Sequence, residues 1–318
     1  MASNHIRKVA IVGAGGNIGS RIVDALLATG KHTVTAITRK DTTSKFPEKV
    51  MPVYVDYNEP ETIFNALRGQ GALIITVGFF APKNLSTLLV QAAAEAEVPW
   101  ILPSEWSPDS AHEGLVRDIS SLQNMPIVRE EIKMLGKSSY VALCCGLWYE
   151  WCLSTPVLFG IDCLGRKATL FDDGNTKINT STLAQVGRSV AGLLSLPIKS
   201  EDGACLDRFR NRHVYTSSFC ISQNDMLESA FRVTGTDRTQ WTIENRPVEE
   251  YYNEGVAARR QGTMREIGRQ VYSRVFFDDD SGNFEKRVGL ANEILNLSGE
   301  DLDEATATAI SLQRQTDL

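Results

Sequence analysis

A glycine-rich turn near the start of the chain is the residue pattern with the clearest chemical meaning. Residues 13–19 have the sequence Gly-Ala-Gly-Gly-Asn-Ile-Gly and follow four apolar residues, 9–12, that predict a buried strand. Apolar residues at helical spacing come next, so the turn joins a strand to a helix. A nucleotide pyrophosphate binds at such a turn, because the first helical N–H groups face the anion. The predicted contacts are Gly13, Gly15, Gly16, Asn17, Ile18 and Gly19.

Each glycine of the turn has its own expected role. Gly13 permits the tight turn, and Gly15 or Gly16 lets the backbone approach the phosphates. Gly19 lets the helix pack closely on the strand. The alternative is a strand–helix turn with a structural role only.

Basic residues after the next predicted strand indicate which dinucleotide binds. Residues 33–37 predict a strand, Arg39 and Lys40 follow it, and Lys45 lies in the same loop. In dinucleotide-binding folds an acidic residue here bonds the ribose 2′-hydroxyl, whereas an arginine accommodates a 2′-phosphate. We therefore expect NADP(H) in preference to NAD(H). The alternative is that these side chains only keep the loop soluble.

Two further strand ends are expected to contact this cofactor. Asp56 ends the predicted strand 51–56, where it bonds the adenine amino group or caps the next helix. Gly78 and Phe79 lie at the end of the predicted strand 72–78. Because ligands bind beyond the carboxyl ends of parallel strands, we place Gly78 and Phe79 in the cofactor cleft.

The order of the predicted elements indicates the fold class. Strands and helices alternate through about residue 145, which predicts an α/β fold with a doubly wound parallel Rossmann sheet. The alternation stops near residue 155. We expect residues 1–155 to form the NADP(H)-binding domain and residues 156–318 mainly a smaller α+β substrate-binding domain, with residues 177–195 returning to the first. Within the second part we expect strands at 177–181 and 213–216, and helices at 183–194, after 222–224 and at 302–312, the last capped by Asp301 or Ser298.

Composition excludes several classes of function. The net charge is −6 over 318 residues and no dense Lys/Arg run is present, which argues against a nucleic-acid partner. No apolar segment of about 18 residues exists, and residues 1–8 lead directly into the first strand, so we expect a cytoplasmic protein without a membrane partner. Six cysteines without CxxC spacing and four scattered histidines predict reduced thiols and no metal site. We expect a monomer or homodimer that binds a small molecule.

Several motifs together resemble the NmrA-like and isoflavone-reductase-like branch of the atypical short-chain dehydrogenases. The resemblance is strong over residues 8–155 and continues more thinly to the C-terminus, and residues 146–150 are more similar to fungal members than to plant ones. It implies a Rossmann domain that carries NADP(H) and a small domain that closes over the nicotinamide. The motifs are the glycine turn, Arg39, Leu102-Pro103-Ser104-Glu105-Trp106, and Val128-Arg129-Glu130-Glu131-Ile132 before Gly136.

The chain departs from this family at one important position. The resemblance implies a lysine near the nicotinamide as general acid or base, at the start of the helix before the sixth strand. An ungapped match through Arg129 places Met125 at that position, and no lysine lies between Lys83 and Lys133. The proton donor that the family uses is therefore missing, and Met125 is expected to contact the substrate.

Other groups at predicted strand ends are candidates for moving protons. Glu105 follows the fifth strand, Tyr149 and Glu150 follow the sixth, and Asp109 lies in the loop between. A carboxylate desolvated by neighbouring tryptophans has a raised pKa, suited to acid/base chemistry. The alternative for each is structural, with Glu105 bonding backbone N–H groups and Tyr149 and Glu150 bracing the second domain. The expected walls of the substrate site are Trp106, Met125 and Trp148.

Three functions are compatible with these residues. The first is an NADP(H)-dependent reductase of an aromatic or heterocyclic imine, iminium ion or enone, in secondary metabolism. The second is an NADP(H)-binding enzyme that performs non-redox acid/base chemistry, such as iminium cyclisation, with a carboxylate. The third is a catalytically silent NADP(H)-sensing regulator, for which a mobile surface loop at residues 278–282 is a suitable feature.

Overall fold

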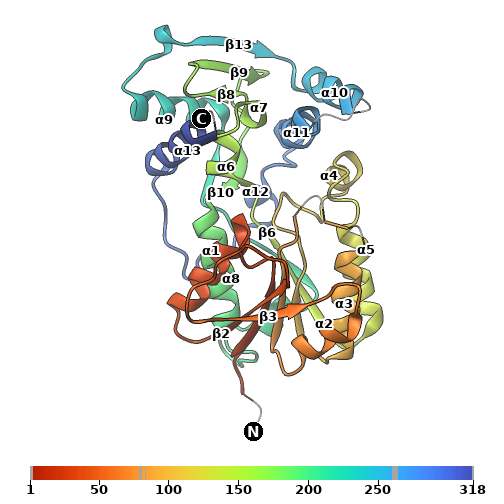
Figure 1. The fold of residues 1–318 in the computed structure, drawn as a ribbon. Coiled ribbons are helices and arrows are strands. Elements are labelled where there is room, and N and C mark those ends of the chain that lie inside the picture. The colour runs from red at the N-terminus through yellow and green to blue at the C-terminus, as the bar shows by residue number, and fades with distance from the viewer. Residues whose placement is uncertain (1–2, 79–80, 83, 260–263, 317–318) are drawn as a thin grey trace.

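The computed structural model describes residues 3–78, 81–82, 84–259 and 264–316. The elements of the first half alternate between strands and helices (Figure 1). They are β1 (Lys8–Val12), α1 (Asn17–Ala28), β2 (Thr33–Arg39), β3 (Val50–Val55), α2 (Pro60–Leu67), β4 (Ala72–Ile75), α3 (Leu85–Glu95), β5 (Trp100–Leu102), α4 (Glu113–Asp118), α5 (Met125–Leu135), β6 (Ser139–Cys144), β7 (Leu147–Trp148) and α6 (Tyr149–Leu153).

The second half has shorter strands and more helices. Three short 3-10 helices also occur in it. Its elements are α7 (Pro156–Phe159), β8 (Ile161–Asp162), β9 (Lys167–Phe171), β10 (Ile178–Ser181), α8 (Leu183–Ser195), β11 (Arg212–Tyr215), β12 (Phe219–Ile221), α9 (Gln223–Thr234), β13 (Thr242–Arg246), α10 (Val248–Arg259), α11 (Met264–Ser273), α12 (Phe284–Val288) and α13 (Leu302–Thr316).

A seven-stranded sheet forms the base of the molecule. Its order is β11-β6-β5-β4-β1-β2-β3, and every neighbouring pair is parallel. Helices α1 and α8 cover one face, and α2, α3 and α5 cover the other (Figure 1). The predicted doubly wound α/β fold is therefore confirmed.

The apolar run of β1 shows why this sequence forms a central strand. Val9 and Ile11 pack in the core on the side of α1 and α8, whereas Ala10 and Val12 pack against α2 and α3. Side chains of a strand alternate between the faces of a sheet, so a strand covered on both faces must be apolar at every position. The uninterrupted run is the consequence.

The strand order reverses between β1 and β4. The chain proceeds from β1 to β2 and β3 in one direction, and from β4 to β5 and β6 in the other. The connections after β1 and β4 therefore diverge and leave a crevice at their carboxyl ends. In doubly wound folds this is where ligands bind.

The second half of the chain contributes both to the large sheet with its covering helices and to two smaller sheets. The short strand predicted at residues 213–216 is β11, and it forms the edge of the large sheet beside β6. Helix α8 packs on α1, and Gly187 permits this because a Cβ there would lie 2.4 Å from the carbonyl oxygen of Arg21. Two smaller sheets, β12-β10-β7 and β13-β9-β8, lie with α9, α10, α11 and α13 in the other half of the molecule (Figure 1).

Two local expectations can be compared with the structure. The C-terminal helix is confirmed as α13, and Asp301 caps it by accepting hydrogen bonds from the N–H groups of Asp303 and Glu304. The loop expected at residues 278–282 is exposed at residues 278–280, in agreement with a surface position. Arg274 donates hydrogen bonds to Asp279 and Ser281, and Ser281 is fully buried, so the loop is anchored at this end. Its mobility stays a prediction.

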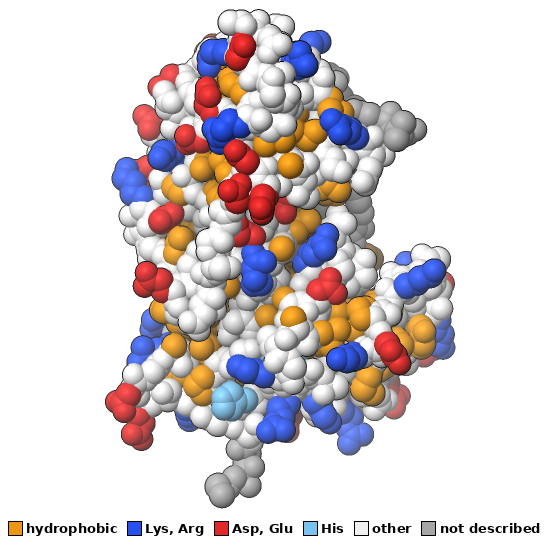
Figure 2. All heavy atoms as spheres, turned by 90° about the vertical axis from the view of Figure 1, so that its left-hand side faces the viewer, with side chains coloured by type: hydrophobic (Ala, Val, Ile, Leu, Met, Phe, Trp, Pro, Cys, Tyr) orange, Lys and Arg blue, Asp and Glu red, His pale blue; other side chains and the backbone are white. Residues whose placement is uncertain are grey.

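The face formed by α1, α8, α9 and α13 carries mixed charge. Figure 2 shows acidic and basic side chains interspersed over this face, without a continuous basic area. Arg188 pairs with Glu300 there, and Arg232 pairs with Asp303 at 2.7 Å.

No helix within the described residues combines the length and the apolar character that crossing a membrane requires.

Candidate functional site

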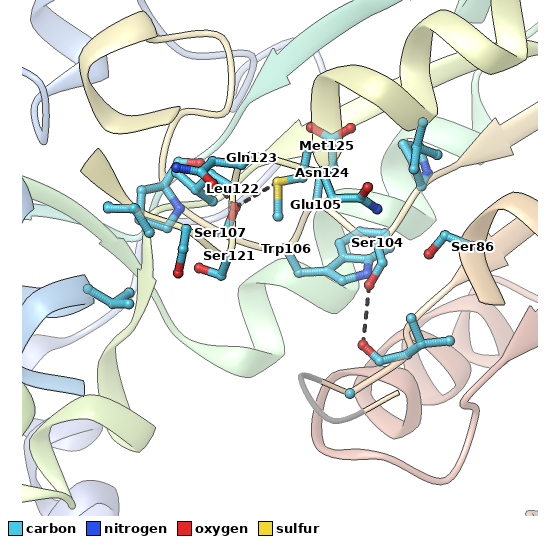
Figure 3. Close-up of a pocket in the computed structure, with 18 of the residues that line it drawn as sticks. Ser86, Ser104, Glu105, Trp106, Ser107, Ser121, Leu122, Gln123, Asn124 and Met125 are labelled. Carbon is cyan, nitrogen blue, oxygen red and sulfur yellow. Dashed lines mark hydrogen bonds between the residues drawn. The ribbon is translucent and has the colours of Figure 1, made fainter. Parts of the chain in front are cut away.

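A cavity of about 730 Å³ lies at the carboxyl edge of the large sheet. Its walls come from the connections after β4, β5 and β6, from residues 119–125 before α5, and from α11. Figure 3 shows the side chains of residues 104–107 and 121–125 around it. The volume is in the range of sites that bind small organic molecules.

The glycine turn after β1 requires glycine at two positions on steric grounds. Gly13 has φ +84°, and a Cβ there would lie 2.3 Å from the carbonyl oxygen of Thr76. A Cβ on Gly19 would lie 2.1 Å from the carbonyl oxygen of Gly13. The first turn of α1 therefore packs directly on the end of β1, as Gly19 was expected to allow.

The start of α1 is open to an anion. Gly15, Gly16 and Asn17 are exposed, and the N-cap Gly16 supplies no side chain to the first helical N–H groups. No acidic residue lies in the first turn of the helix. The first N–H groups of α1 and the positive end of its dipole both face the space in front of the helix, which suits a pyrophosphate.

The turn and the cavity are neighbours. Thr76 contacts Gly13, and the next two residues, Val77 and Gly78, line the cavity. A dinucleotide held at the turn therefore has room to extend its far end into the cavity. Phe79, which was predicted beside Gly78, lies outside the described residues.

The basic residues predicted for the 2′-phosphate lie on the other side of the turn. Arg39 ends β2 and is exposed, with its Nε 3.4 Å from Asp41. The following loop returns to the turn, because a Cβ on Gly15 would lie 2.5 Å from the hydroxyl oxygen of Ser44. Lys40 and Lys45 are exposed in this loop. These three cations are therefore exposed near the turn, and their binding of a 2′-phosphate stays a prediction.

Asp56 does not cap the helix that follows it. Its carboxylate accepts hydrogen bonds from the backbone N–H of Asn58 at 2.9 Å and from the side chain of Asn58 at 3.0 Å. Helix α2 begins four residues later, after Glu59. The capping alternative is therefore wrong, and a contact with adenine stays a prediction.

Glu105 is the one proton-transfer candidate that lines the cavity. It is 1% exposed and forms an ion pair with Arg129 of α5. Ser110 donates a hydrogen bond to Oε2 of Glu105 at 2.5 Å, and Nε2 of His213 lies 3.9 Å from the same oxygen. Among the described residues, Oε1 of Glu105 has no hydrogen-bond partner.

The pKa values of Glu105 and His213, which lie close together in this buried site, are both shifted. Burial raises the pKa of Glu105 above its usual range, although Arg129 and Ser110 act in the opposite direction. Burial, together with the positive charge of Arg129, lowers the pKa of His213 to about 4. His213 is therefore neutral at pH 7, and Arg129 is the partner that compensates the Glu105 carboxylate.

The other candidates lie away from the cavity. Tyr149 is fully buried against Phe159 and Phe219, and its hydroxyl lies 2.7 Å from that of Thr306 on α13. Oε2 of Glu150 accepts a hydrogen bond from the N–H of Leu183 at 3.1 Å, at the start of α8. Neither residue lines the cavity, so their positions match the structural alternative.

Asp109 is also engaged within the protein. It is 1% exposed and accepts hydrogen bonds from Arg287 at 2.7 Å and from the hydroxyl of Tyr215 at 3.2 Å. It does not line the cavity. Its contacts join the loop after β5 to β11 and α12, which is a structural role.

The three predicted wall residues all line the cavity. Trp106 is buried, and its indole N–H donates to the carbonyl oxygen of Ile75 at 2.8 Å. Met125 begins α5 with its sulfur 3.8 Å from the hydroxyl oxygen of Ser107 (Figure 3). Trp148 comes from β7 and is half-buried. Together they present ring and thioether surface to the cavity.

The structure adds wall residues that the sequence did not indicate. Tyr272 and Val271, on α11, line the cavity, as do Ser120 and Ser121 before α5. Helix α11 begins more than a hundred residues after β6, so the expectation that ligands bind at strand ends could not identify these residues.

In the described part of the chain, no group of three or more His, Cys, Asp or Glu side chains has an arrangement suited to a metal ion.

Comparisons with known proteins agree with this architecture. Residues 6–154 match the model of the NmrA-like family. Oxidoreductase aprR of Aspergillus flavus is 28% identical over 309 residues, which cover 95% of this chain and 98% of that protein.

Among solved structures, isoflavone reductase has a TM-score of 0.72 at 20% identity, over 96% of this chain and 99% of that one. The binary complex of leucoanthocyanidin reductase and NADPH from Vitis vinifera has a TM-score of 0.73 at 18% identity, over the same shares. At these identities the likeness concerns the fold. Residues 6–154 are therefore similar to the NmrA-like family, and the chain along nearly its whole length has the fold of isoflavone-reductase-like proteins.

Proposed function

We propose that this protein is an NADP(H)-dependent reductase of an aromatic or heterocyclic small molecule. The observation that carries the proposal is the contact between the glycine turn and the cavity, through Gly13 and Thr76. This contact places an anion-binding helix start beside a space with aromatic walls. The name of the fungal relative aprR, an oxidoreductase that matches 95% of the chain, supports the reaction class.

The residues that would hold NADP(H) lie along one edge of the large sheet. The turn at residues 13–19 would bind the pyrophosphate, and Arg39, with Lys40 and Lys45, would bind the 2′-phosphate. Gly78 lines the cavity, and no atom of the described residues lies within 4 Å of a Cβ built on it, so the nicotinamide would reach the cavity past it. When bound, the cofactor supplies a hydride.

The cavity favours a substrate without negative charge. Glu105 is the single charged residue among its described lining residues, and Arg129 already compensates it. A carboxylate or phosphate on the substrate would thus find no cation in the described walls. Trp106, Trp148 and Met125 instead suit a flat apolar ring.

The residue at the family's lysine position limits the chemistry. Met125 has no proton to give, and its thioether lines the cavity. Reduction of an iminium ion or an enone demands less of a proton donor than reduction of an unactivated ketone. We therefore place imines and enones ahead of simple ketones as substrates.

We further propose that residues 1–155, with parts of the later chain, hold the cofactor, and that residues 156–318 mainly complete the substrate site. Val271 and Tyr272 support this division, because α11 brings them to the cavity. Non-redox chemistry on a carboxylate receives less support. Glu105 is paired with Arg129, and Glu150 does not line the cavity.

The test is NADPH oxidation by the purified protein with a panel of aromatic imines, enones and ketones. We expect turnover with one or more imines or enones. Product formation without NADPH oxidation would support the non-redox enzyme. Tight NADPH binding with no turnover on any of the compounds would contradict the proposal and favour a regulator.

A further inference from the structure

Tyr272 lines the cavity, and its hydroxyl has no hydrogen-bond partner among the described residues. It lies at the end of α11, next to Cys152 in the cavity wall. Within the described part of the chain, no hydrogen bond involves its hydroxyl, and this oxygen is not among the atoms sealed inside the protein. A half-buried phenol normally bonds to a partner. The absence of one leaves its donor available to a ligand.

The position of Tyr272 is held firmly from both sides. Arg274 donates to Oδ2 of Asp118 at 2.8 Å, and Gln270 donates to the carbonyl oxygen of Asp118 at 3.1 Å. Tyr252 donates to the same carbonyl oxygen at 3.0 Å. Asp118 ends α4 directly before the cavity-lining residues 119–125. Asp118 therefore links the end of α11 to the cavity wall formed by residues 119–125.

Three other donors of the cavity wall are already engaged. Ser104 donates to the carbonyl oxygen of Val77 at 3.3 Å, and Ser107 to that of Pro108 at 3.1 Å. Trp106 donates its indole N–H to Ile75. Tyr272 differs from these groups because its donor is not used within the described structure.

We propose that Tyr272 recognises the substrate by donating a hydrogen bond from its hydroxyl to an uncharged oxygen atom of that molecule. The inference rests on the proposed function for the identity of the ligand as an aromatic small molecule. It adds that the substrate carries a carbonyl, ether or hydroxyl oxygen on the side that faces α11. Tyr272 thereby selects oxygenated aromatic compounds over hydrocarbons of the same shape.

The chemistry of the phenol suits this role. Burial raises the pKa of Tyr272 above its ordinary value, so the hydroxyl keeps its proton at neutral pH. Its neighbour Cys152 also keeps its proton, because burial raises the pKa of this thiol well above the usual range. The wall is therefore neutral, and a neutral oxygen is the acceptor that it can bind without burying a net charge.

The test compares two probes in a binding experiment that needs no turnover. Chalcone contains two aromatic rings and a carbonyl oxygen, and trans-stilbene contains two rings and no oxygen. Their dissociation constants are measured with NADP⁺ present, by quenching of tryptophan fluorescence, in the natural protein and in Tyr272→Phe. We expect Tyr272→Phe to weaken chalcone binding by roughly threefold to tenfold and to leave stilbene binding unchanged.

The control is Tyr140→Phe, which removes a buried hydroxyl on β6 that does not line the cavity. It should leave both dissociation constants unchanged. An equal loss for the two probes, no loss for chalcone in Tyr272→Phe, or chalcone binding no tighter than stilbene binding in the natural protein would overturn the proposal. A lack of NADPH oxidation would contradict the reductase instead, because this experiment measures binding alone.

Discussion

Arg129 of α5 and Glu105 after β5 form an ion pair at the wall of the cavity, which Glu105 lines. Both side chains are at most 9% exposed, so both charges are largely removed from solvent. The pair joins the helix that begins at Met125 to the loop that carries Trp106. We therefore predict that Glu105 fixes the shape of the site and does not move protons.

The first prediction concerns this pair. Glu105→Gln should lower the free energy of unfolding by about 3–5 kcal/mol, because it leaves the Arg129 charge buried without a counter-charge. The double variant Glu105→Gln with Arg129→Met should regain part of that loss. Urea unfolding measures both changes. A Glu105→Gln protein that is as stable as the natural one but inactive would show instead that Glu105 is catalytic.

The second prediction concerns the glycine turn. Gly19→Ala would place a Cβ 2.1 Å from a backbone oxygen that cannot rotate away, so α1 must shift from β1. Although alanine favours a helix over glycine, the affinity for NADPH should fall about tenfold or more. Calorimetric titration with NADPH measures the loss. Gly299→Ala is the control, because no atom lies within 4 Å of its Cβ position, and it should bind NADPH normally.

The third prediction concerns the choice of dinucleotide. Arg39→Ala removes an exposed cation beside the turn, so the KM for NADPH should rise about tenfold or more, whereas the KM for NADH should stay unchanged. Steady-state kinetics with each cofactor measures the two values. Lys31→Ala is the matched control, because Lys31 precedes β2 at the opposite edge of the sheet. Equal changes for both cofactors in Arg39→Ala would contradict a role in binding the 2′-phosphate.

The fourth prediction concerns stability in acid. The pKa of His213 is lowered from 6.5 to about 4 in the folded protein, mainly by burial. Between these pH values the unfolded chain binds a proton that the folded protein does not, so stability falls as the pH falls through this window. The shift corresponds to a loss of about 3 kcal/mol by pH 4.

The measurement is the free energy of unfolding at pH 7 and at pH 4. His213→Gln should show a smaller difference between the two values than the natural protein. His32 contributes in the same direction, because burial lowers its pKa as well, so the comparison must be made with the natural protein. An unchanged pH dependence in His213→Gln would contradict the assignment.

The sequence by itself determined the local structure of the Rossmann half. The glycine turn, the strand before it and the helix after it are contiguous, so local residue patterns encode their backbone geometry. The apolar run of β1 likewise predicted a strand covered on both faces, and the sheet confirms it. Trp106, Met125 and Trp148 were found for a related reason, since strand ends and helix starts lie at one edge of a doubly wound sheet.

Only the tertiary structure decided which polar groups face the cavity. Tyr149 follows a strand end, where ligand-binding residues are expected. Packing against α13 nevertheless directs its hydroxyl to Thr306. Tyr272 belongs to a helix far along the chain, and Asp118 holds it at the cavity. Backbone elements follow from neighbouring residues, whereas the direction of a side chain depends on contacts between residues that are distant in sequence.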